Sequence, residues 1–142
     1  MQANGPRLLI ADDDRDFRES LGEVFARRGF TTCLAADGCE ALEIVRATRE
    51  LHLVILDIHM PRLTGLQALE QIRQQRMGGQ NQADSSLPQL SLPCILMSAQ
   101  VDEAIVRQAE ELETQVLSKP FTLRLVTETV EDMLHRSYGW RI

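Results

Sequence analysis

The stretch Leu53-Val54-Ile55-Leu56-Asp57 joins four apolar residues directly to a carboxylate. A short continuous apolar run of this kind is typical of a strand buried on both faces, as in a parallel sheet. The same arrangement recurs where residues 8–11 precede Asp12 and Asp13, and where residues 116–117 lead to Lys119. Because open α/β sheets bind ligands at the carboxyl ends of their strands, we expect these charged side chains to share one edge.

Segments with apolar residues at helical spacing separate the strand-like runs. The pattern predicts five strands, each followed by a helix, with the strands at residues 7–11, 31–36, 53–57, 94–98 and 115–118. Thr64 and Gln67 match a capping box at the start of the third helix, and Thr122 is the expected cap of the last. The fold class is therefore α/β, with one parallel sheet covered by helices on both faces and right-handed crossovers.

Length and charge narrow the class of protein. With 142 residues we expect a single domain, and the net charge of −6 disfavours direct nucleic-acid binding by this segment. The chain contains no stretch of 18 apolar residues, so we expect no membrane span. The first six residues lack a signal-peptide core. The three cysteines lack metal-ligand spacing, so we expect a reducing, cytoplasmic location.

Two segments fall outside this alternation. Residues 77–93 are rich in Gly, Gln, Ser and Pro and predict a long surface loop between the third helix and the fourth strand, or a loop that contacts a partner. Residues 137–142 could be a frayed helix end, the start of a linker or a docking segment. We expect His52 and His135 on the surface.

The charged residues at the strand ends suggest phosphoryl chemistry. If the first and third strands are neighbours, Asp12, Asp13 and Asp57 converge and oppose one another's ionisation. A Mg²⁺ ion, which prefers oxygen ligands, removes that conflict and still leaves a carboxylate able to act as a nucleophile. Lys119 would meet a phosphoryl oxygen, and Ser98 supplies a hydroxyl at the same edge.

In these motifs the chain resembles the receiver domain of bacterial two-component response regulators, the CheY-like family. The resemblance rests on residues 8–14, 53–61, 95–99 and 117–121, together with Gly65. It implies a flavodoxin-like (βα)5 domain over residues 1–136 with strand order 2-1-3-4-5. Each motif is weak alone, and the specificity lies in their occurrence in order, each at a strand end.

The resemblance also implies a role for each site residue. Asp57 would accept a phosphoryl group from a sensor histidine kinase or phosphotransfer protein. Asp12 and Asp13 would hold Mg²⁺ together with Asp57 and the backbone oxygen of His59. Ser98 and Lys119 would bind the phosphoryl oxygens.

The same resemblance predicts how the signal leaves the domain. Phosphorylation would reshape the face formed by the fourth helix, fifth strand and fifth helix, which would bind a downstream effector domain or protein or form a homodimer. Two departures concern this output: Val116 occupies the usual aromatic switch position, and residues 111–114 replace a frequent turn of small residues.

Two other functions compete with this interpretation. A haloacid-dehalogenase-like phosphatase also uses an aspartyl phosphate, but it expects a second acid where this chain has His59. A pseudo-receiver would be an interaction module that is never phosphorylated, which the intact acidic set disfavours. We expect a signalling module rather than an enzyme, since it would catalyse only its own phosphorylation and dephosphorylation. Six residues follow Arg136, so it is either a stand-alone regulator or, as we favour, a fragment without its effector.

Overall fold

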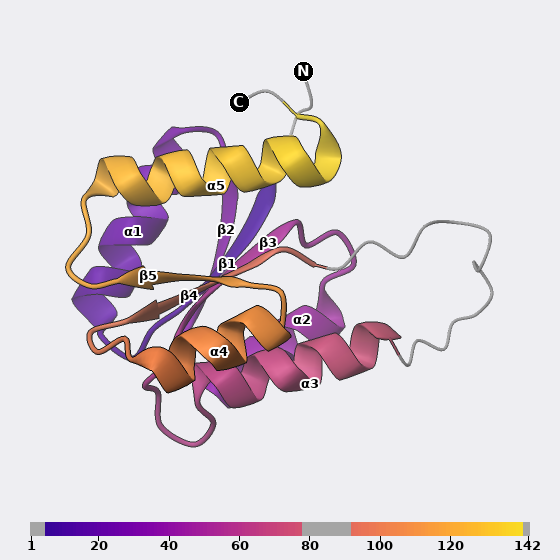
Figure 1. Ribbon diagram of the computed structural model, residues 1–142. Helices are drawn as coiled ribbons and strands as arrows, with labels where there is room; N and C mark the ends of the chain where they lie inside the picture. Colours follow the sequence, from indigo (N-terminus) through magenta and orange to yellow (C-terminus); the bar gives the residue numbers. More distant parts are fainter. Residues whose placement is uncertain (1–4, 78–91, 141–142) are drawn as a thin grey trace.

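The computed structural model describes residues 5–77 and 92–140 (Figure 1). The strands are β1 (Arg7–Ala11), β2 (Thr31–Ala35), β3 (Leu53–Asp57), β4 (Cys94–Ser98) and β5 (Gln115–Ser118). The helices are α1 (Arg15–Arg27), α2 (Gly38–Ala47), α3 (Gly65–Met77), α4 (Glu103–Glu111) and α5 (Leu123–Tyr138). All neighbouring strands are parallel and lie in the order β2-β1-β3-β4-β5, which confirms the predicted topology.

Helices cover both faces of the sheet. Figure 1 shows α1 and α5 on one face and α2, α3 and α4 on the other. Leu8 and Ile10 of β1 pack in the cluster beneath α1 and α5, whereas Leu9 and Ala11 belong to the opposite cluster. Because successive side chains alternate between two covered faces, β1, β3 and β4 are apolar almost throughout.

The predicted helix caps are confirmed. The Thr64 N–H donates to Gln67 Oε1 at 3.0 Å and the Gln67 N–H to Thr64 Oγ1 at 3.1 Å, the reciprocal pair of a capping box. The Leu125 N–H donates to Thr122 Oγ1 at the start of α5. These caps satisfy N–H groups that have no partner within their own helix.

Arg73 of α3 hydrogen-bonds to two segments that are distant from it in the sequence, one just before β4 and one just after α4. Its guanidinium donates to the carbonyl oxygens of Leu92 at 2.6 Å and Leu112 at 3.1 Å. The turn after α4 places Glu113 in the left-handed region, with φ 55°, a conformation that glycine adopts most readily. Of the loop predicted at residues 77–93, residues 78–91 lie outside the described part, so that prediction stays untested.

The end of α5 lies against the amino edge of the sheet. The helix runs two residues beyond Arg136 to Tyr138, whose hydroxyl donates to the His52 carbonyl oxygen at 2.9 Å. The Tyr138 and Trp140 rings stack at 4.7 Å, and the Trp140 ring is 4.8 Å from that of His52. His52 is half-buried, so the expectation of a surface histidine is wrong: its Nδ1 accepts the Arg7 N–H at 2.9 Å.

Within residues 5–77 and 92–140, no helix has both the length and the hydrophobicity needed to cross a bilayer.

Replacement of Gly65 by alanine should destabilise the fold by roughly 1–3 kcal/mol, the usual cost of overpacking. A β-carbon at this position would overlap the backbone carbonyl oxygen of Asp57, which belongs to the sheet and cannot move aside. The measurement is urea unfolding at neutral pH.

Gly22→Ala is the matched control for this change. An added β-carbon there meets the flexible Leu34 side chain, whose nearest atom is Cδ2 at 3.1 Å, and alanine favours the helix by about 1 kcal/mol. We therefore expect this variant to stay within about 1 kcal/mol of the wild type. Equal stability of the two variants would contradict the tight contact at Gly65.

Candidate functional site

Three carboxylates meet at the carboxyl edge of the sheet. Asp12 and Asp13 follow β1, and Asp57 ends the neighbouring strand β3. One carboxylate oxygen from each lies within 4.8 Å of the others. The predicted convergence is therefore present, and it results from the pairing of β1 with β3.

Lys119 connects the two buried acids. It follows β5, and its Nζ lies 2.8 Å from Asp12 Oδ2 and 3.5 Å from Asp57 Oδ1. Asp12 is completely buried and Asp57 is 5% exposed, whereas Asp13 is exposed. The site thus consists of two buried acids and a largely buried lysine, with an exposed third acid beside them.

Ser98 lies at the same edge but bonds within its own loop. Its buried hydroxyl donates to the Gln100 carbonyl oxygen at 2.8 Å and accepts the Gln100 N–H at 3.1 Å. The Lys119 N–H donates to the Ser98 carbonyl oxygen at 2.8 Å, which joins the ends of β4 and β5. His59 is exposed on the loop after β3, and its role as a backbone ligand remains a prediction.

Two residues of α1 belong to the site although the sequence did not mark them. Arg18 Nη1 donates to the Asp12 carbonyl oxygen at 2.7 Å, and the Lys119 Nζ lies 4.5 Å from the centre of the Phe17 ring. Asp14 caps this helix by accepting the Phe17 N–H. Contacts to a backbone oxygen and to a ring face follow no sequence motif, so only their position on the first turn of the helix hinted at them.

Burial and like charge shape the ionisation of the site. Burial, reinforced by the charge of Asp12, raises the pKa of Asp57 to about 6, against the opposing charge of Lys119. Burial alone would lower the pKa of Lys119, but its hydrogen bond to Asp12 and the nearby carboxylates outweigh it and raise that pKa. Three oxygen donors with excess negative charge are a donor set that suits Mg²⁺.

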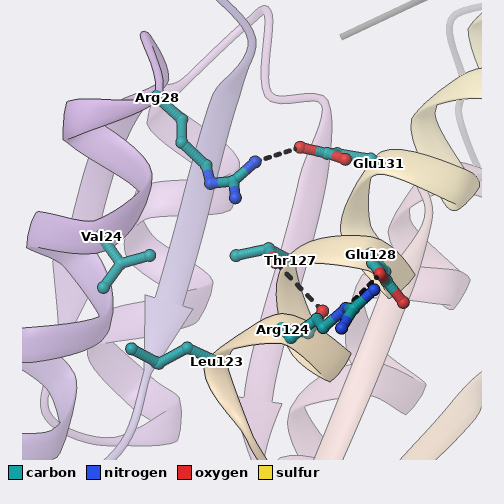
Figure 2. A pocket seen from close by; sticks show the side chains of 7 residues that line it. All are labelled: Val24, Arg28, Leu123, Arg124, Thr127, Glu128 and Glu131. Atoms are coloured by element: carbon teal, nitrogen blue, oxygen red, sulfur yellow. Dashed lines mark hydrogen bonds and ion pairs between the residues drawn. The ribbon is translucent and has the colours of Figure 1, made fainter.

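A separate hollow lies between α1 and α5 (Figure 2). It has a volume of about 550 Å³ and is lined by apolar Val24 and Leu123 together with Arg28 and charged residues of α5. Nη1 of Arg28, the C-cap residue of α1, and Oε2 of Glu131 in α5 form an ion pair at 2.6 Å across it. The acidic cluster is not part of its lining, so this pocket is separate from the candidate site.

Replacement of Asp57 by asparagine should stabilise the metal-free protein at pH 7.5 by about 1–3 kcal/mol. The folded-state pKa of Asp57 is raised to about 6, so ionisation of this group costs stability above that pH. The gain should shrink as the pH falls below about 6 and nearly vanish near pH 4, where the wild-type carboxyl is protonated. Urea unfolding in a chelator measures it.

Addition of Mg²⁺ provides the control for this variant. The ion should stabilise the wild type by mass action and Asp57→Asn much less, which narrows or reverses the difference. An equal, pH-independent stability of the two proteins in chelator would contradict the raised pKa of Asp57.

Comparison with known proteins agrees with this geometry. Residues 8–131 match the family model described as the response regulator receiver domain. The chain is 30% identical over 132 residues to the response regulator RR06 of Streptococcus pneumoniae, covering 92% of this chain and 54% of that protein. It is 38% identical over 117 residues to the Regulator of RpoS of Escherichia coli K12, covering 82% and 31%. The chain thus spans about half or less of these curated relatives.

A solved structure shows the same arrangement. The response regulator TrrA of Thermotoga maritima, in complex with Mg²⁺-BeF, superimposes with a TM-score of 0.73 at 27% identity. The alignment covers 92% of this chain and all of that one. Fold, site and family match agree, and the chain belongs to the response regulator receiver domains of two-component systems.

Proposed function

We propose that Asp57 accepts a phosphoryl group from a phosphohistidine of a sensor kinase or phosphotransfer protein and thereby switches this domain between two signalling states. The observation that carries the proposal is the buried pair of Asp12 and Asp57 with the Lys119 ammonium 2.8 Å and 3.5 Å away. A carboxylate that ends an apolar strand beside a fixed cation is suited to attack phosphorus. The family match favours this function over the phosphatase alternative.

The transfer requires few groups. An Asp57 carboxylate oxygen forms a bond to phosphorus as the bond from phosphorus to the imidazole nitrogen breaks, and the imidazole keeps that electron pair and takes up a proton. Lys119 neutralises charge on the phosphoryl oxygens, which is most of what such a reaction needs. Ser98 would donate its hydroxyl to the same oxygens after releasing the Gln100 carbonyl.

The acidic cluster would bind Mg²⁺ through Asp12, Asp13 and Asp57, with the His59 backbone oxygen as a further ligand. When bound, the ion supplies positive charge against the phosphoryl oxygens. The similar TrrA structure contains Mg²⁺-BeF, which supports the same cation for this chain. The ion pair between Lys119 and Asp12 would weaken, because the bound Mg²⁺ would compensate part of the negative charge of Asp12.

The output surface is proposed to be the face of α4, β5 and α5. Val106 of α4 is 41% exposed and Leu125 of α5 is 44% exposed, so apolar side chains are available there. An effector domain, a separate protein or a second phosphorylated copy would bind this face in the cytoplasm, without direct nucleic-acid contact by this segment. The protein would catalyse only its own phosphorylation and dephosphorylation. Val116 of β5 is half-buried and would have to transmit the change without a rotating ring.

Incubation with acetyl phosphate and Mg²⁺ should add the mass of one PO₃H unit to the wild type and none to Asp57→Ala. Intact-protein mass spectrometry measures the change. Chelation of Mg²⁺ should abolish the labelling, because three uncompensated carboxylates repel the donor.

Asp16→Asn is the matched control, since it neutralises an exposed acid on the same helix that follows the site. It should be labelled like the wild type. Labelling of Asp57→Ala at the wild-type rate would refute Asp57 as the acceptor, and an unlabelled wild type would support a pseudo-receiver.

A further inference from the structure

The Lys119 ammonium lies between carboxylates and an aromatic face. Its Nζ is 2.8 Å from Asp12 Oδ2 and 4.5 Å from the centre of the Phe17 ring. A cation over a ring face within about 6 Å is attracted by the ring quadrupole, and more strongly where water is excluded. The Lys119 side chain is only 22% exposed, so this attraction acts in a partly dry setting.

The position of the Phe17 ring is itself fixed. The backbone N–H of Phe17 is held by the Asp14 cap at the start of α1, at 3.2 Å. Its ring meets that of Phe121 edge to face, with centroids 5.9 Å apart and planes at 72°. Phe121 follows Lys119 by two residues, so the partner ring belongs to the same loop that carries the lysine.

A lysine needs such support more than most groups in a site. Its ammonium ends a flexible four-carbon stem and can point in many directions. The ammonium lies closer to Asp12, at 2.8 Å, than to Asp57, at 3.5 Å. A ring face adjacent to the ammonium restricts the directions that remain and keeps the charge near both acids.

We propose that Phe17 is a positioning residue for Lys119, holding its ammonium beside Asp57 for phosphoryl acceptance. This inference rests on the proposed function of Asp57. In this role Phe17 acts on the acceptor only through the lysine. The simpler alternative is that Phe17 merely fills space between α1 and the loop after β5.

Phosphorylation by acetyl phosphate in saturating Mg²⁺ distinguishes the two roles. Phe17→Leu keeps most of the apolar volume but removes the ring face, and it should slow the initial rate by about 2- to 30-fold, the range of such contacts. Phe17→Tyr keeps the ring face and should restore the rate to near the wild-type value. A rate for Phe17→Leu equal to that of the wild type, or no rescue by tyrosine, would overturn the proposal.

Phe121→Leu is the matched control. It removes an equivalent ring from the same aromatic pair but leaves the Phe17 ring beside Lys119. Its rate should fall much less than that of Phe17→Leu. An equal loss in both variants would assign the effect to packing of the pair and overturn a positioning role.

A second measurement tests the contact without any phosphorylation. Phe17→Leu, Lys119→Met and the double variant form a cycle whose folding equilibrium constants come from urea unfolding in chelator. We expect a coupling of about 2- to 30-fold, because the ring stabilises the fold partly through the ammonium. Strictly additive effects would refute the contact.

The two measurements separate failure of this inference from failure of the proposed function. If the wild type accepts no phosphoryl group, the proposed function fails, and the proposed role of Phe17 in phosphoryl acceptance fails with it, even where the unfolding cycle still shows the contact. If the wild type is labelled but the variants behave alike, only the positioning role fails.

Discussion

The repulsion between Asp12 and Asp57, buried side by side and balanced by one lysine, is the constraint around which the domain is organised. Burial of the carboxyl, and after it the negative charge of Asp12, raises the pKa of Asp57 to about 6 although Lys119 opposes the rise. The fold tolerates this because the acids lie at the ends of paired central strands, whose apolar packing holds them in place. The site is therefore poised to accept positive charge, and a cation or a phosphoryl transfer changes a balance that already exists.

Much of the fold could be predicted because its strands are buried on both faces. Such strands are continuous apolar runs, and a charged residue that ends each run marks the edge at which ligands bind. Cap residues such as Thr64 and Thr122 act over three positions, so a local pattern reveals them. The strand order, by contrast, came only from resemblance to a known family, since alternation of strands and helices does not fix it.

The contacts that sequence reasoning missed join residues far apart in the chain. Lys119 meets Phe17, Arg73 meets the carbonyl of Leu112, and Tyr138 meets the carbonyl of His52. Every residue type has a backbone oxygen, so an arginine or tyrosine that donates to one does not require a particular partner residue. The sequence therefore contains no pair of residue types that predicts such a contact. His52 was expected at the surface for this reason: its burial depends on two aromatic rings at the far end of the chain.

The anchoring of Tyr138 and Trp140 on His52 has a consequence for the geometry of signalling. It fastens the last turn of α5 to the rim of the sheet where strands begin, whereas the reactive aspartate occupies the rim where they finish. Any domain attached after residue 140 would lie at the end of the sheet opposite to Asp57. A conformational change that starts near Asp57 and follows α5 would cross roughly 24 Å, at 1.5 Å per residue. Because the last turn of α5 is fixed, the helix would transmit this change as a rigid unit.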